Sequence, residues 1–290
     1  MTHYTLQNDQ LKVLIRHQGA ELASVIDQHS GIEYMWQADP KVWGSHAPVL
    51  FPIIGGLKES IYQYGGQSYS LPKHGMIRHA EDLSFSTGSD FVSCLLTPNE
   101  RTRAIYPFDF EFELTYRLNG RQIIQEHRIK NNGDGPLPFS IGGHPAFRVP
   151  LREGEKYTDY SLRFEFFETA PSYQVNENGL IANELRPGLQ GWELALRHDL
   201  FSKDALVLRN HRSRRIGLVH RDKGEVLSVS FPGWPYLGIW AKPDGDFVCI
   251  EPWLGLSDTT EASGLIMEKE GIQILGPQQV FRADYSIQLA

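Results

Sequence analysis

Apolar and polar residues alternate along much of this chain. In FDFEFELTYRL (108–118), apolar side chains occupy every even position and polar side chains every odd position. Successive side chains of a strand point to opposite faces, so this period of two predicts a strand with one buried face. SLRFEFFE (161–168) repeats the pattern, and LSFSTGSDFVSCLLTP (83–98) predicts two strands joined by a turn at GSD.

The remaining apolar runs are also short and bounded by Gly, Pro, Asn or Asp. Further strands are expected at LKVLIRH (11–17), RQIIQEHRIKN (121–131), ALVLRN (205–210), RIGLVH (215–220), EVLSVSFP (225–232), YLGIWAK (236–242), FVCIEP (247–252) and VFRADYSIQL (280–289). Only DPKVWGS (39–45) and TPNERTRAI (97–105) suggest helices, both brief, and 176–191 reads as a long surface loop. The pattern predicts an all-β sandwich or barrel. Strands of one kind on both sides of the loop favour a single domain over 1–290.

Composition argues against several classes of protein. The chain has 290 residues and two cysteines, Cys94 and Cys249, which provide neither a disulfide framework nor a CxxC metal motif. The net charge of −7 argues against nucleic acid as a partner, because phosphate contacts need a basic face. The N-terminus lacks a signal-peptide pattern, and no apolar run approaches the roughly 18 residues of a membrane span. We therefore expect a cytoplasmic protein with no membrane partner.

Two histidines lie on irregular chain. His144, in FSIGGHPAFRVP (139–150), follows two glycines and precedes a proline, which disfavours helical backbone at the histidine. The glycines would let a ligand approach the backbone closely. A solvated turn histidine and an acid/base imidazole are equally good interpretations of this motif. His74, in SLPKHGMIR (70–78), reads more simply as a solvated loop histidine when taken alone.

Two carboxylates have suggestive positions. Alternation in FVCIEPWLGLSD (247–258) places Phe247, Cys249 and Glu251 on one face, and Glu251 at the end of an apolar strand. Burial would raise the pKa of that carboxyl and make it a candidate base. A glutamate that points to water or pairs with an arginine is the alternative. Asp204, just before an apolar strand, could bind sugar hydroxyls or could simply stabilise a turn.

Other chemistries lack their motifs. The 11 histidines form neither HxH nor HExxH, so no metal is expected. GxSxG, GxxxxGK[ST] and GxGxxG are also missing, so no cofactor is expected. The 6 Trp, 12 Tyr and 15 Phe include rings that could stack on sugars, although most are expected to fill the core.

Several motifs taken together resemble the aldose 1-epimerase (galactose mutarotase-like) family. They occur in the order LFPIIGGLKES, SLPKHGMIR, IGGHPAFRVPL, KDALVL, CIEPWLGLSD and KEGIQILGP. The likeness runs from about residue 3 to the C-terminus and is greatest for the branch whose second histidine lies in GGHPAF. It implies a large antiparallel β-sandwich, the galactose mutarotase-like supersandwich, with a small-molecule sugar bound in an open cleft. It also implies interconversion of the α and β anomers of a hexose without a cofactor.

The resemblance also implies residue roles. Glu251 matches the general base that deprotonates the C1 hydroxyl, and His144 matches the general acid that protonates the ring oxygen. We expect the two to face each other across the sugar and each to sustain the other's charge near neutral pH. His74 matches a residue that holds the substrate near the ring oxygen, and Asp204 one that binds hydroxyls.

One position departs from the family pattern. Many members carry a sugar-binding arginine where this chain has Gly55-Gly56, so Lys58 or Arg78 is expected to substitute for it. A hexose 6-phosphate mutarotase is an alternative, with Arg78, His79, Arg148 and Arg152 as a basic rim. A sugar-binding sensor without turnover is another. The sequence leaves the sugar, and the choice between monomer and homodimer, open.

Overall fold

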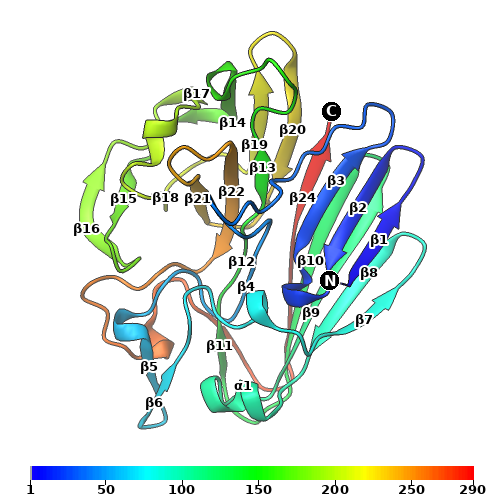
Figure 1. Cartoon of the computed structure of the whole chain (residues 1–290). Helices are drawn as coiled ribbons and strands as arrows, with labels where there is room; N and C mark the ends of the chain where they lie inside the picture. Colours follow the sequence, from blue (N-terminus) through cyan, green and yellow to red (C-terminus); the bar gives the residue numbers. More distant parts are fainter. Residues whose placement is uncertain (1) are drawn as a thin grey trace.

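Antiparallel strands are the main regular structure of this computed structural model, which describes residues 2–290. The largest sheet has nine strands (Figure 1). Their order across the sheet is β17 (Gly191–Ala195), β14 (Tyr160–Glu168), β19 (Arg215–His220), β20 (Gly224–Ser230), β24 (Val280–Leu289), β10 (Gln122–Asn131), β9 (Phe110–Asn119), β8 (Phe91–Leu96) and β7 (Ser84–Thr87).

A second, eight-stranded sheet carries the candidate site. Its order is β16 (Ile181–Arg186), β15 (Ser172–Val175), β18 (Leu206–Leu208), β21 (Tyr236–Trp240), β22 (Phe247–Leu254), β12 (Ile141–Gly143) and β4 (Val49–Leu50), and β13 (Ala146–Arg148) also pairs with β22. All eight residues of β22 are buried, which fits a central strand covered on both faces.

Smaller elements complete the fold. Three small sheets are β1 (His3–Gln7) with β2 (Leu11–Arg16) and β3 (Leu22–Asp27), β5 (Ile61–Tyr64) with β6 (Gln67–Ser70), and β11 (Leu137–Phe139) with β23 (Gln273–Leu275). Helical segments in residues 2–290 are α1 (Glu100–Ile105) and the 3₁₀ turns η1 (Gln18–Ala20), η2 (Lys58–Ser60), η3 (Ile77–His79), η4 (Tyr157–Asp159), η5 (His198–Phe201) and η6 (Ile266–Glu268). None of these helical segments is long and apolar enough to cross a membrane.

The buried faces of the two large sheets meet in the core. Phe112 of β9 lies under Phe51, which directly follows β4, with ring centroids 4.7 Å apart. Gly143 of β12 lies against Tyr285 of β24 so closely that an added Cβ would be 2.2 Å from the Tyr285 hydroxyl oxygen. One hydrophobic cluster includes residues of both sheets and of β1–β3. The large antiparallel β-sandwich predicted from alternation and resemblance is therefore confirmed.

Two local predictions were wrong. The segment 176–191 is not one long loop, because its middle forms β16, an edge strand that pairs with β15. The segment 39–45 is a turn rather than a helix, in which Val42 N and Trp43 N both donate to Asp39 O. The short helix in 97–105 exists as α1, capped by Asn99, whose side chain accepts from Thr102 N.

Candidate active site

A cavity of about 280 Å³ opens on the eight-stranded sheet. This volume is near the lower end of the range of about 300–1,000 Å³ for small-molecule sites. The charged and imidazole side chains that line it are His74, His144, Glu251, Asp204, Lys73, Arg78 and Lys242. Five of the six site residues named from the sequence thus line one cavity: His74, His144, Glu251, Asp204 and Arg78.

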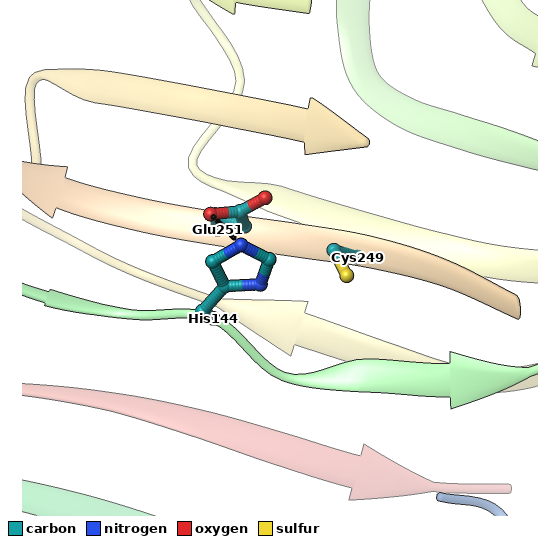
Figure 2. A group of neighbouring side chains, drawn as sticks. All are labelled: His144, Cys249 and Glu251. Carbon is teal, nitrogen blue, oxygen red and sulfur yellow. Dashed lines mark ion pairs between the residues drawn. The ribbon is translucent and has the colours of Figure 1, made fainter. Parts of the chain in front are cut away.

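Strand register brings His144 and Glu251 together. Gly142 pairs with Trp253, and Ala146 pairs with Cys249, so continuing either register places His144 opposite Glu251. His144 Nε2 lies 3.2 Å from Glu251 Oε2. Figure 2 marks this contact with a dashed line. Both side chains are almost fully buried, with 8% of His144 and 1% of Glu251 exposed. The two groups therefore form a close pair in one wall of the cavity, side by side, and do not face each other across a sugar.

The glycines before His144 serve a different purpose from the one predicted. An added Cβ on Gly142 would lie 2.8 Å from Ile54 Cδ1 and from Trp253 Cδ1, and Gly143 is just as crowded by Tyr285. Neither glycine lines the cavity. These glycines let strand β12 approach protein side chains closely, which fixes the chain that holds His144.

Burial shifts both members of the pair toward their neutral forms. Desolvation raises the pKa of Glu251 well above its ordinary value, an effect that Lys73 partly opposes and Asp204 reinforces. Desolvation, with smaller contributions from the nearby charges of Arg78 and Lys73, lowers the pKa of His144 to about 3. Burial therefore acts against the expectation that each group sustains the charge of the other near neutral pH, because it disfavours both charged forms.

His74 presents a defined tautomer to the cavity. Its Nδ1 accepts a hydrogen bond from Gly55 N at 3.1 Å, so the ring hydrogen lies on Nε2. Desolvation lowers the pKa of His74 well below its usual value, which keeps the ring neutral. The His74 and His144 rings are 5.6 Å apart and perpendicular. His74 also has a φ of +68°, a strained backbone conformation that is concentrated at functional sites.

Asp204 also has left-handed backbone, with a φ of +66°. One carboxylate oxygen accepts from Ala205 N at 2.7 Å, so the side chain caps its own turn while it lines the cavity. The guanidinium of Arg186 donates to the Asp204 carbonyl oxygen at 2.8 Å. Asp204 therefore stabilises a turn, as one of the two interpretations predicted, and also lines the cavity.

Three tryptophans surround the pair. Trp43 stacks on the His144 ring at 5.1 Å, and Trp240 meets the same ring edge-on at 5.7 Å. Trp253 also lines the cavity, where its indole partly opposes the raised pKa of Glu251, although its buried Nε1 has no hydrogen bond of good geometry within residues 2–290. Glu251 Oε2 and His144 Nδ1 likewise lack a well-directed partner in this part of the chain. Unsatisfied buried polar atoms beside a cavity fit a ligand rich in hydroxyl groups.

The cationic residues differ from those expected. Arg78 lines the cavity, but Lys58 does not, because its Nζ lies 3.4 Å from Ala262 O in a separate hollow. Of the proposed basic rim, Arg148 and Arg152 also lie outside the cavity; Arg148 lines another hollow and Arg152 pairs with Glu155. His79 lines a small adjoining hollow of about 110 Å³. Sequence reasoning missed Lys73, which precedes His74 in SLPKHGMIR, and Lys242, and both lysines are exposed.

Cys249 completes a cluster that spacing rules could not detect. One ligand atom each of His144, Cys249 and Glu251 lies within 4.8 Å of the others (Figure 2). These residue types can hold a zinc ion. However, the thiol is fully buried, burial raises its pKa well above the usual value, and Cys249 does not line the cavity. We therefore assign no metal to this cluster.

Comparisons with known proteins point to one family. The sequence model of the aldose 1-epimerase family matches residues 2–272. The chain is 35% identical to Protein LacX of Lactococcus lactis subsp. lactis, in both plasmid and chromosomal forms, over 292 aligned residues that cover 97% of each chain.

Solved structures agree with this relationship. A galactose mutarotase related enzyme from Lactobacillus acidophilus superposes with a TM-score of 0.94 at 35% identity, covering 100% of this chain and 97% of that one. A galactose mutarotase-like protein from Lactobacillus casei gives a TM-score of 0.91 at 26% identity, with 100% of both chains covered. This protein therefore belongs to the aldose 1-epimerase family of isomerase-type enzymes.

Proposed function

We propose that the protein is a mutarotase that interconverts the α and β anomers of an aldose, with Glu251 as general base and His144 as general acid. The observation that carries the proposal is the 3.2 Å separation of His144 Nε2 and Glu251 Oε2 in the wall of a cavity. Family membership supports an epimerase-type reaction, and the cavity supplies an acid and a base at adjacent positions.

The side-by-side arrangement suits the chemistry. Mutarotation opens a cyclic hemiacetal, rotates the C1–C2 bond and closes the ring on the other face of C1. The hydroxyl oxygen O1 and the ring oxygen O5 are both bonded to C1, so a base for one and an acid for the other must act at neighbouring points. Glu251 takes the O1 proton while His144 gives a proton to O5, which breaks the C1–O5 bond. On closure the two groups exchange roles. Each positioned proton transfer typically contributes about 10²–10⁴ in rate.

The pair can reach its working state without exchanging protons with water. A neutral carboxyl beside a neutral imidazole holds as many protons as a carboxylate beside an imidazolium. Transfer of one proton from Glu251 to His144 therefore interconverts them. Sugar hydroxyls that donate hydrogen bonds to Glu251 favour its carboxylate form, which turns the resting pair into base and acid.

His74 and Asp204 bind the sugar in this proposal. The hydrogen on His74 Nε2 makes the ring a donor toward the substrate, as its Nδ1 is occupied by Gly55 N. Asp204, in contrast, accepts hydrogen bonds from sugar hydroxyls. Trp43 and Trp240 restrict the position of the His144 ring.

Polarimetry tests the function directly. Fresh α-glucose and α-galactose should equilibrate faster with the wild-type protein than in buffer. Glu251→Gln, which keeps the shape of the side chain and removes the base, should lower kcat by about 10²–10⁴. Glu261→Gln is the matched control, because Glu261 is an exposed turn residue outside the cavity.

The results separate an enzyme from a sensor. A wild-type protein that accelerates no aldose, yet binds one in a calorimetric titration, would replace the mutarotase with a sugar-binding module. A Glu251→Gln variant as active as wild type would disprove the base assignment and leave the reaction type standing.

A further inference from the structure

We propose that Asp258 and Lys269, a buried ion pair behind the cavity lining, are positioning residues that hold His74 in place through the segment 55–58. Neither member of the pair lines the cavity. The inference rests on the proposed function for what His74 does, because in that proposal His74 binds the sugar. How His74 is held follows from the fold alone and is tested separately below.

The ion pair lies in the interior, beyond the end of β22. Lys269 Nζ donates to Asp258 Oδ1 at 2.6 Å, and only 5% of Asp258 and 7% of Lys269 is exposed. The other carboxylate oxygen, Oδ2, accepts a hydrogen bond from Lys58 N at 3.0 Å. Burial of two charges is costly even when they are paired. We therefore expect this pair to specify a geometry rather than to add stability.

Asp258 and its neighbour Ser257 fasten the segment 55–58 to the loop that follows β22. In addition to the bond described above, Asp258 N donates to Gly56 O at 2.9 Å. Ser257 Oγ accepts a hydrogen bond from Gly56 N, also at 2.9 Å. A Cβ added to Gly55 would lie 2.5 Å from Ser257 Cβ, so the two stretches of chain are in direct contact. A shift of the loop would therefore displace the segment.

The segment in turn fixes the backbone and the ring of His74. Gly55 N donates to His74 Nδ1 at 3.1 Å, and His74 N donates to Gly55 O at 2.8 Å. The backbone of His74 is left-handed, with a φ of +68°. Such a strained conformation persists only where its surroundings over-determine it. Displacement of Gly55 would therefore release both the backbone of His74 and the tautomer of its ring.

The same two loop residues hold a second stretch of the cavity lining. Asp258 O accepts a hydrogen bond from Ile181 N at 2.8 Å, and Ser257 Oγ donates to Gly179 O at 2.6 Å. Gly179, Ile181 and Ser257 all line the cavity. One buried ion pair thus lies behind two stretches of lining, and its loss should loosen both.

The variant Asp258→Asn tests the proposal with little change of shape. The amide can still contact Lys58 N or Lys269 Nζ, but it cannot form the ion pair, so the segment 55–58 should loosen. ¹⁵N NMR of the His74 ring reports the tautomer. In the wild type one ring nitrogen carries the hydrogen and the other does not, and in the variant the two nitrogen shifts should move toward their average. This measurement needs neither sugar nor turnover.

Kinetics distinguish positioning from proton transfer. In the proposed function His74 binds the sugar while Glu251 and His144 transfer protons. Asp258→Asn should therefore raise KM about three- to tenfold, the effect of one lost hydrogen bond, and change kcat by less than about threefold. Lys269→Met should have the same effect. Lys269→Arg should retain most of the wild-type behaviour, because it keeps the charge and a hollow of about 120 Å³ beside the pair can accept the larger side chain.

Asp27→Asn is the matched control, because Asp27 is a similar group in another sheet. It ends β3, is 6% exposed, pairs with Arg121 at 2.7 Å and accepts a hydrogen bond from Ser30 N at 2.7 Å. This variant should lower the midpoint of urea unfolding, as Asp258→Asn does, and leave the His74 shifts and KM at wild-type values. The double variant Asp258→Asn with Lys269→Gln leaves no unpaired buried charge and replaces any single variant that does not fold.

Two results would overturn the inference: wild-type His74 shifts in folded Asp258→Asn, or equal movement of these shifts in Asp258→Asn and Asp27→Asn. Moved His74 shifts in a protein whose wild type accelerates no mutarotation would uphold the positioning role and reject the proposed function. Moved shifts with a wild-type KM would uphold the positioning of His74 and contradict its assignment as a sugar-binding residue.

Discussion

Two buried histidines, His144 in the cavity and His127 in the core, have similar surroundings by several measures. Desolvation lowers the pKa of each to about 3, and in residues 2–290 the Nδ1 of each lacks a hydrogen-bond partner. Each also contacts a tryptophan, Trp43 for His144 and Trp234 for His127. Burial, an unsatisfied nitrogen and a shifted pKa therefore do not distinguish a candidate catalytic histidine from a structural one.

The two histidines differ in the groups that surround Nε2, the other ring nitrogen. His144 Nε2 has a carboxyl oxygen at 3.2 Å and a cavity beside it. His127 Nε2 has the amide of Gln125 at 3.4 Å, Tyr285 stacks on its ring, and His127 does not line the cavity. A second titratable group together with space for a substrate is what gives a buried imidazole a chemical use.

The largest expected difference is in catalysis. His144→Gln should lower kcat for mutarotation by about 10²–10⁴, because it removes the proposed acid. His127→Gln should leave kcat close to wild type and lower the free energy of unfolding by about 1–3 kcal/mol, because it disturbs only core packing. Polarimetry and urea denaturation measure the two quantities. Equal losses of kcat in both folded variants would break the comparison.

The next difference is in how stability depends on pH. Between pH 6.5 and about 3, unfolded His127 binds a proton that the folded form does not. His127 therefore makes stability fall as the pH falls through this window, by about 1.4 kcal/mol per pH unit. Burial also lowers the pKa values of His211 and His74, which add to the slope. His127→Gln should reduce the slope by the share of one histidine, as urea denaturation at pH 7 and pH 5 would show. An unchanged slope would mean that His127 is protonated in the fold.

Unlike a lone buried histidine, the His144–Glu251 pair should leave stability independent of pH. Between pH 4.5 and 6.5 the folded pair keeps its proton on Glu251 and the unfolded chain keeps one on His144, so the two states bind equal numbers. Relative to wild type, Glu251→Gln should steepen the rise of stability with pH in this window, and His144→Gln should reduce it. Denaturation curves of the wild type and the two variants at three pH values measure these changes in slope, and changes of the same sign would contradict the neutral pair.

The smallest expected effect concerns Trp43, which covers the His144 ring. Trp43→Leu should admit water, raise the pKa of His144 from about 3 toward 6.5, and weaken sugar binding roughly two- to tenfold. NMR titration of the imidazole measures the pKa. Trp36→Leu is the control, because Trp36 contacts Phe247 and does not line the cavity. An identical shift in both variants would argue against a local effect of Trp43.

Alternation predicted several long strands with one buried face, such as β9 and β14, but it passed over β1, β3, β5, β6, β15 and β17. It failed at β16, whose sequence IANELR lacks the period of two. This strand is at the edge of its sheet, where backbone pairing with β15 defines it and most of its side chains are exposed or half-exposed. Its apolar pattern therefore carries little information about its structure.

Motif reasoning selected Glu251, His144, His74, Asp204 and Arg78, and the fold places them around one cavity. Their catalytic and binding roles stay predictions. Lys58 has an equally suggestive position in the sequence, yet its backbone N donates to Asp258 and its ammonium is directed to Ala262 O. Lys242 could not be selected in advance, because exposed lysines are common on every protein surface, whereas Lys73 was overlooked beside His74 in SLPKHGMIR.

The sequence alone determined the period-two strands, the sandwich they predict and the types of residue available for proton transfer. Only the tertiary structure decided that His144 and Glu251 are neighbours, through the antiparallel register of β12 and β13 against β22. It also decided that the two stand side by side, and that burial favours the neutral pair over the charged one. The physical reason is that distance and desolvation depend on which strands pack together, and a linear pattern of residues does not contain that information.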